Sequence, residues 1–227
     1  MARFGIYRTS VPIVLLTDFG FKDSYVGVMK GVIRSISRDA DIIDLCHNIM
    51  PQDVAEAAFV LEASYGYFPP GAIFVCVVDP GVGSDRAILC MKAHEQLFLA
   101  PDNGLLSVIP ESGGREIWAV EANEYFLKGT SMTFHGRDIF APVAAHLAEG
   151  LEPSKLGPRV EHIRALRLPK PVRAADGSLR GQVVYIDQFG NLITNIRGSM
   201  LRRNFQGAED KLNLSNIQFH MTLGYWF

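Results

Sequence analysis

The chain has 227 residues, of which 48% are hydrophobic and 20% are charged, and its formal net charge is −2. This length and balance are typical of a globular protein with one large domain, or with one domain and a smaller one. The slightly negative charge excludes a basic field for nucleic acid or for a membrane surface. The longest apolar runs are far shorter than the roughly 20 residues of a membrane span.

The N-terminal part of the chain alternates between strand-like and helix-like patterns. Short apolar runs predict strands, and apolar residues at helical spacing predict helices. In chain order, the pattern predicts a strand at Val11–Leu16, a helix at Tyr25–Ile36, a strand at Asp41–Leu45, a helix at Asp53–Phe68, strands at Ala72–Val78, Ile88–Met91 and Leu97–Ala100, and a helix at Ile139–Glu149. This alternation predicts a Rossmann-like α/β domain over residues 1–150, with a mainly parallel sheet.

The C-terminal part follows a different pattern. Residues 151–179 are rich in Pro, Arg and Lys and show no clear period, so we expect a linker there. Strands are expected at Arg180–Ile186, Leu192–Ile196 and Leu212–His220. The sequence therefore predicts a small, mostly β domain over residues 180–227.

The cysteines and the N-terminus bear on the compartment. Cys46, Cys76 and Cys90 lie in apolar, strand-like segments without a CxxC pair, which favours buried reduced thiols. Met1–Arg8 has no apolar signal core. We therefore expect a cytoplasmic protein.

Four polar clusters follow apolar or strand-like segments of the predicted domain. Mainly parallel sheets bind ligands beyond the carboxyl ends of their strands, so we expect a site to be built from these clusters. They are Thr17-Asp18, Asp79-Pro80-Gly81, Asp102-Asn103 and His135-Gly136-Arg137-Asp138.

Each candidate residue also has a structural explanation. Asp18 suits a helix cap, Asp79 suits a turn that caps backbone amides, and a lone histidine such as His135 is usually structural. In chemical terms, the Asp18 carboxylate has enough lone pairs to accept both hydroxyls of a ribose. Phe189 and Asn191 offer an aromatic face and an amide for adenine, although the same segment suits a hairpin turn.

A metal site is a further alternative. The six histidines show no HxH, HxxxH or HExxH spacing, so no metal site is encoded locally. A dispersed site would suit a metal-dependent phosphoesterase, and residue chemistry alone leaves it open. Its ligands would be drawn from Asp18, Asp79, Asp102, Asn103 and His135.

Several segments together resemble one family. They are Thr17-Asp18-Phe19-Gly20, Asp23-x-Tyr25-Val26-Gly27-x-Met29-Lys30-Gly31, Val77-Val78-Asp79-Pro80-Gly81-Val82-Gly83, Arg86, Ala100-Pro101-Asp102-Asn103-Gly104, Phe134-His135-Gly136-Arg137-Asp138 and Asp187-x-Phe189-Gly190-Asn191-x-x-Thr194-Asn195. In this order they resemble the S-adenosyl-L-methionine (SAM) hydroxide adenosyltransferases, relatives of the bacterial fluorinase and chlorinase. Each segment is weak alone, but the ordered set is highly specific.

The resemblance implies hydrolysis of SAM to adenosine and L-methionine by water that attacks C5′ of the ribose, without a cofactor or a metal. It implies that Asp79, Arg86 and His135 handle the water, and that the remaining site residues bind substrate. Those substrate-binding residues are Asp18, Phe19, Phe134, Gly136, Asp187, Phe189 and Asn191. The halogenating relatives have an aromatic residue in place of Asp79, no counterpart of His135 and, in the fluorinase, a serine in place of Gly136, which favours the hydrolase branch.

The chemistry of the three water-handling residues suggests their roles. Arg86 cannot act as a base, because a guanidinium stays protonated, but it can stabilise developing hydroxide charge. His135 can act as the base, with an ordinary pKa of about 6.5. Asp79 can orient the water or its partners.

The resemblance also bears on assembly. It implies a homotrimer in which each site forms between the α/β domain of one subunit and the β domain of its neighbour. It further implies a β-barrel-like second domain that continues beyond Leu212–His220, so we expect that domain to be truncated here. A protein that binds adenosine or SAM without turnover is therefore an alternative.

Overall fold

The computed structural model of the protein describes residues 11–175 and 178–202. The chain divides into two compact units after Arg167. We call the first the α/β unit and the second the β unit, and describe each by itself.

The α/β unit is built on one sheet, which has six strands in the described part of the chain, in the order β2-β1-β3-β5-β4-β6. Its strands are β1 (Pro12–Thr17), β2 (Asp41–Cys46), β3 (Ile73–Val77), β4 (Ile88–Ala93), β5 (Gln96–Pro101) and β6 (Arg115–Ala119). Strands β2, β1, β3 and β5 pair in parallel, whereas β4 is antiparallel to both of its neighbours. The predicted α/β fold with a mainly parallel sheet is confirmed.

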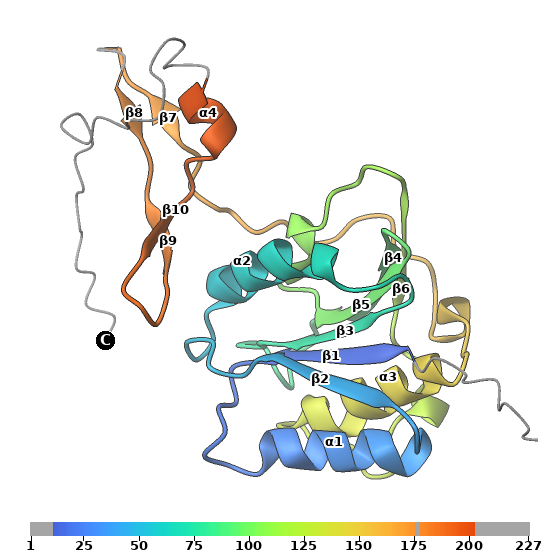
Figure 1. Cartoon of the computed structure of the whole chain (residues 1–227). Coiled ribbons are helices and arrows are strands. Elements are labelled where there is room, and N and C mark those ends of the chain that lie inside the picture. The colour runs from blue at the N-terminus through green and yellow to red at the C-terminus, as the bar shows by residue number, and fades with distance from the viewer. Residues whose placement is uncertain (1–10, 176–177, 203–227) are drawn as a thin grey trace, which may run out of the picture. The chain divides into compact units, whose positions relative to one another are not determined.

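Helices cover both faces of this sheet. The α-helices are α1 (Tyr25–Ile36), α2 (Val54–Ser64) and α3 (Ala141–Ala148), and the shorter turns are η1 (Tyr65–Tyr67), η2 (Leu105–Val108), η3 (Asn123–Tyr125), η5 (Pro153–Lys155) and the π-helical η4 (Gly136–Phe140). Helices α1 and α3 lie on one face of the sheet and α2 lies on the other (Figure 1).

The two faces of β1 are both part of the core. Ile13 and Leu15 pack with α1 and α3, whereas Val14 and Leu16 pack with α2, because successive side chains of a strand point to opposite faces. All four side chains are fully buried. A strand covered on both faces needs apolar residues at every position, which explains the continuous apolar run in the sequence.

The register of the parallel strands aligns their carboxyl ends. Leu16 of β1 pairs with Cys46 of β2 on one side and with Cys76 of β3 on the other. Asp18 and Asp79 follow these strand ends, so they leave the sheet at the same edge. This is the edge at which parallel α/β sheets bind their ligands.

Two parts of the α/β unit differ from the sequence prediction. Strand β6 was not predicted; it begins with two charged residues and pairs with β4 at the edge of the sheet. Residues 151–167 were expected to begin a linker, but they pack on the α/β unit. Leu156 is fully buried in its core, and Arg159 forms a β-bridge with Trp118. These contacts hold an irregular backbone, which has no period to detect.

The β unit contains two short antiparallel strand pairs. Strand β7 (Val172–Arg173) pairs with β8 (Leu179–Arg180), β9 (Val183–Ile186) pairs with β10 (Leu192–Thr194), and the short helix α4 (Gly198–Arg202) follows. The single strand predicted at Arg180–Ile186 is divided between β8 and β9, which pair with different strands. Between them, the backbone N of Gln182 donates to the side chain of Asn195. The strand predicted at Leu212–His220 lies outside the described residues.

The cysteines lie on strands of the α/β unit and are free thiols. Cys76 and Cys90 are buried, and burial raises the pKa of both thiols. Cys46 is only half-buried. Among residues 11–175 and 178–202, no helix combines the length and the apolar character needed to cross a membrane.

Candidate active site

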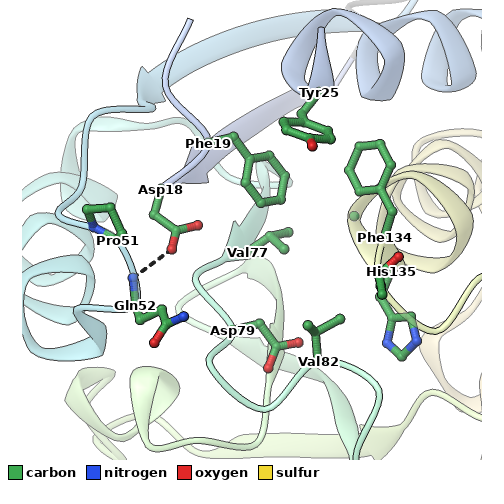
Figure 2. Close-up of a pocket in the computed structure, with 12 residues that line it drawn as sticks. Asp18, Phe19, Tyr25, Pro51, Gln52, Val77, Asp79, Val82, Phe134 and His135 are labelled. Atoms are coloured by element: carbon green, nitrogen blue, oxygen red, sulfur yellow. Dashed lines mark hydrogen bonds between the residues drawn. The ribbon is translucent and has the colours of Figure 1, made fainter. Parts of the chain in front are cut away.

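A pocket of about 290 Å³ lies at the carboxyl edge of the sheet in the α/β unit. Side chains surround it from three sides: Asp18 and Gln52 on one, Asp79 on the second, and Phe134 and His135 on the third (Figure 2). The full lining is Asp18, Phe19, Tyr25, Pro51, Gln52, Val77, Asp79, Val82, Thr133, Phe134, His135 and Gly136. Its volume is at the lower end of the range for small-molecule sites.

Asp18 lies just beyond β1 and is half-buried. Its Oδ2 accepts a hydrogen bond from the backbone N of Gln52 at 2.8 Å (Figure 2). The residue at the N-terminus of α1 is Ser24, so Asp18 does not cap that helix. Gln52 has a φ of 67°, a left-handed conformation that is uncommon for a residue with a side chain and often marks a functional site.

Asp79 and Arg86 form a buried ion pair. Arg86 Nε donates to Oδ1 and Oδ2 of Asp79 at 2.8 and 2.7 Å, and its Nη2 also donates to Oδ2. Each side chain is only 5% exposed. Asp79 Oδ1 also accepts from the backbone N of Gly81 at 3.2 Å, so the turn-capping contact considered in the sequence is present as well.

His135 immediately precedes η4 and contacts this pair. Its Nδ1 lies 2.8 Å from Nη2 of Arg86. Because a guanidinium can only donate, Nδ1 must hold the lone pair, and the ring is neutral with its proton on Nε2. Burial and the positive charge of Arg86 lower the pKa of His135, against the opposing charges of Asp79 and Asp138.

This contact bears on the role that the sequence suggested for His135. A base needs a free lone pair, and the one on Nδ1 is engaged by Arg86. The geometry therefore favours His135 as a hydrogen-bond donor through Nε2 and does not favour it as a base. The structure brings Asp79, Arg86 and His135 together, with Arg86 in contact with both of the others.

Three aromatic rings form an apolar wall of the pocket. Phe19, Tyr25 and Phe134 pack mostly edge-on, with ring centroids 5.0 to 5.8 Å apart. Gly136 is buried against this wall, and a Cβ there would lie 3.2 Å from Phe19, Phe134 and Met29. A glycine at this position lets the rings approach each other.

The residues predicted to contact substrate from the second domain lie on the turn between β9 and β10. Asp187 Oδ1 accepts from the backbone N of Phe189 and of Asn191, both at 2.9 Å, and its Oδ2 accepts from Asn191 Nδ2 at 2.7 Å. These hydrogen bonds lower the pKa of Asp187, and the one from the Asn191 side chain contributes most. The turn presents Phe189, which is 81% exposed. Within the β unit, the hairpin considered in the sequence is confirmed.

The residues of the alternative metal site have other partners. Both oxygens of Asp79 accept from Arg86. Asp102 Oδ1 accepts from the backbone N of Arg164, and Asn103 donates to the carbonyl of Val78. Across residues 11–175 and 178–202, no group of three or more His, Cys, Asp or Glu side chains is arranged to hold a metal ion.

Some residues of the pocket were not identified from the sequence. Gln52 lies in a loop outside the family motifs, and Tyr25 and Val82 stood within those motifs but were not named as site residues. The best available signal was Pro51-Gln52 directly before a helix start, since a tight turn there follows the end of β2. That signal says nothing about which way the turn faces.

Gly83, in the loop between Asp79 and Arg86, lies against the loop that precedes His135. Its φ is 78°, and a Cβ there would lie 2.5 Å from the backbone carbonyl of Met132. We expect Gly83→Ala to lower the free energy of unfolding by about 1–3 kcal/mol, through left-handed strain, and to move the loop before His135. This movement should weaken the contact between Arg86 and His135, so kcat for the expected SAM hydrolysis should fall as well.

Gly113→Ala is the matched control, because Gly113 has a φ of 90° and open space around its Cβ position. It carries the same backbone strain without the collision. Thermal unfolding and turnover should separate the two variants, with only Gly83→Ala losing kcat. Equal kcat in both variants would contradict the proposed link between the loops.

The fold and the pocket define a class of protein. A parallel α/β sheet with a pocket at its carboxyl edge, lined by carboxylates, aromatic rings and a histidine, is the arrangement of an enzyme that acts on a small molecule. The comparisons with known proteins narrow this class. Residues 13–157 match the SAM hydroxide adenosyltransferase N-terminal domain, and residues 181–223 match the C-terminal domain of the same family. The chain belongs to the SAM hydroxide adenosyltransferase family.

Individual relatives agree with this assignment. The chain is 39% identical over 192 residues to the (R)-S-adenosyl-L-methionine hydrolase of Salinispora tropica, an alignment that covers 83% of this chain and 73% of that protein. It is 31% identical to the fluorinase of Nocardia brasiliensis, with 89% and 77% covered. The crystal structure of a conserved protein from Thermotoga maritima superposes with a TM-score of 0.80 at 45% identity, with 85% and 74% covered.

Proposed function

We propose that this protein hydrolyses SAM to adenosine and L-methionine. The observation that carries the proposal is that Asp18 and the Asp79–Arg86–His135 set line or adjoin one pocket. Asp18 provides a carboxylate for the two ribose hydroxyls, and the three-residue set lies where water can be held. The names of the relatives support the same reaction.

The substrate supplies much of the driving force. Its sulfonium makes C5′ electrophilic, and the departing thioether is neutral, so no general acid is needed. The water oxygen forms the new bond to C5′, the C5′–S bond breaks, and its electron pair stays on sulfur. Attack on a cation disperses charge, and the aromatic wall of Phe19, Tyr25 and Phe134 provides a dry environment for this step.

The nucleophile is the difficult part of the reaction. We assign the hydrogen-bond acceptor for the water to Asp79, which lines the pocket and whose orientation Arg86 fixes. The Nε2–H of neutral His135 donates to the water oxygen and stabilises the hydroxide charge that develops there. Arg86 joins both side chains and stays protonated throughout. The proton released from the water is taken up by solvent.

Adenosine release tests the reaction directly. The names of the relatives specify the (R) form of the substrate, so the (R) and (S) forms are supplied separately and adenosine is followed by chromatography. Adenosine is expected from the (R) form. If neither form gives adenosine above the control without enzyme, this chain does not perform the reaction. Calorimetry with adenosine would then reveal a binding protein without turnover.

The ribose assignment predicts that Asp18→Ala weakens binding. A hydrogen bond to a charged group contributes about 1.5–3 kcal/mol, so the adenosine Kd should rise at least about tenfold. Because the ribose is held in the ground state and in the transition state, KM should rise more than kcat falls. Asp39→Ala, which removes an exposed carboxylate beyond the C-terminal end of α1, is the control. An unchanged Kd in Asp18→Ala would show that Asp18 does not bind the ribose.

We further propose a homotrimer with sites shared between subunits, which the family resemblance implies. The proposal is supported by the division of the predicted contact residues between the α/β unit and the β unit. Light scattering should give a trimer mass. Mixing Asp79→Ala with Asn191→Ala subunits should restore part of the activity, because some sites in mixed trimers carry neither lesion. A monomer mass, or no recovery on mixing, would contradict shared sites.

We also propose that the reaction needs no cofactor or metal and takes place in the cytoplasm. The free thiols of Cys46, Cys76 and Cys90 support a reducing compartment. Turnover should be unaffected by a chelator, and elemental analysis should find no stoichiometric metal. Loss of activity in chelator would favour the metal-dependent alternative.

A further inference from the structure

A second histidine, His47, lies behind the pocket in a network of polar side chains. It follows β2, and its side chain is fully buried. Its Nδ1 is 2.8 Å from Thr17 Oγ1, and its Nε2 is 2.9 Å from Asp44 Oδ1. Asp44 Oδ2 in turn accepts from Lys30 Nζ on α1 at 2.6 Å. The network therefore ties β1, β2 and α1 together at the edge that bears the site.

The hydrogen bonds of this network have a consistent direction. Burial acts to raise the pKa of Asp44, but hydrogen bonds from Lys30 and His47 outweigh it and hold that pKa below its usual value. The ionised carboxylate accepts from Nε2 of His47, and in the neutral tautomer of the ring Nδ1 accepts from the hydroxyl of Thr17. The oxygen of Thr17 then accepts the backbone N–H of Phe19 at 3.2 Å. Every donor in this network, from Lys30 to the backbone N–H of Phe19, therefore has an acceptor.

Both ends of the Asp18–Phe19 segment are held by this histidine. The carbonyl of His47 accepts from the backbone N of Gly20 at 2.7 Å, and the Phe21 ring packs edge-on against its imidazole. Side chain and backbone of one residue thus fix the loop before and after the two pocket residues.

We propose that His47, acting through Thr17, is a positioning residue that sets the place of the Asp18 carboxylate and the Phe19 ring in the pocket. This inference rests on the proposed function, because Asp18 is its ribose ligand. Neither His47 nor Thr17 lines the pocket, so their effect on substrate passes through the loop. Displacement of the loop weakens ground-state and transition-state binding alike, which raises KM and leaves kcat nearly unchanged.

Thr17→Val and Thr17→Ser form the matched pair for this test. Valine keeps the shape of the fully buried side chain but removes the hydroxyl, whereas serine keeps the hydroxyl. Thr17→Val is expected to raise the KM for SAM and the adenosine Kd by about tenfold or more, with kcat within about threefold of wild type. Thr17→Ser is expected to stay within about threefold of wild type in all three quantities.

Two further variants complete the design. Asp44→Asn changes a side chain that is one-third exposed, so it tests the same network if Thr17→Val does not fold, and KM should rise in the same direction. His146→Leu on α3 changes a half-buried histidine outside the pocket, and it should lower the unfolding temperature without moving KM.

The outcomes separate the two claims. A lower unfolding temperature with unchanged KM and adenosine Kd in Thr17→Val and Asp44→Asn would overturn the positioning role and leave the proposed function intact. Absence of turnover in the wild type, with adenosine still bound more weakly by Thr17→Val, would remove the proposed reaction and leave the positioning role. If the wild type neither turns over SAM nor binds adenosine, both claims fail.

Discussion

His135→Leu is expected to lower kcat for SAM hydrolysis by about 10²–10³-fold, the usual loss when one donor to a developing negative charge is removed. His135→Gln is expected to keep much of the wild-type kcat, because its amide can still donate although it cannot act as a base. The distinction follows from the contact between Nδ1 and Arg86, which leaves His135 only an N–H to offer. Adenosine affinity should change little in either variant.

The pH dependence of kcat/KM gives a second measurement on the same residue. Burial and the Arg86 charge hold the pKa of His135 below its usual value of about 6.5, so the neutral ring persists below that pH. As the pH falls through the lowered pKa, a proton on Nδ1 would face Arg86 and break the contact, and activity should fall. The acid limb should disappear in His135→Gln. If Gln and Leu were equally inactive at every pH, His135 would be the base instead.

The parts of the fold that the sequence predicts well are those with local causes. Strand β1 is covered on both faces, so its apolar run was visible without knowledge of its neighbours. Strand β6 lies at the sheet edge and mixes charged with apolar residues, and residues 151–167 adopt an irregular path held by contacts such as the bridge between Trp118 and Arg159. Their structure depends on partners far away in the chain, which no local pattern records.

The site also has features that the sequence predicts and features that depend on the fold. The resemblance of the ordered motifs to one family implied that Asp79, Arg86 and His135 form one set, although each motif is weak alone. The direction of the hydrogen bond between Arg86 and His135 depends on how two loops meet 49 positions apart in the chain. The partnership of Thr17 with His47 spans 30 positions and was likewise not visible. Motifs in the sequence identify candidate residues. The fold determines the hydrogen-bond partners of each residue, and through them its protonation state.

The buried pair of Asp79 and Arg86 allows stability and activity to be separated. Asp79→Leu should leave the Arg86 charge buried without its partner, and loss of one member of a buried pair typically costs about 3–5 kcal/mol in the free energy of unfolding. The double variant Asp79→Leu/Arg86→Met should recover most of that stability, since an apolar pair of similar size avoids the desolvation penalty. It should not recover turnover, which we expect to fall by about 10²–10⁴-fold in both variants.

Denaturant unfolding and turnover, measured on the same samples, check this prediction. The control is Glu116→Leu, which breaks the ion pair with Arg159 on the exposed side of β6 and should change the free energy of unfolding by less than about 1 kcal/mol. Recovery of both stability and turnover in the double variant would mean that the pair only supports the fold. Recovery of stability alone would show that Asp79 and Arg86 take part in the reaction, because the apolar replacement restores the packing and leaves the water without its acceptor.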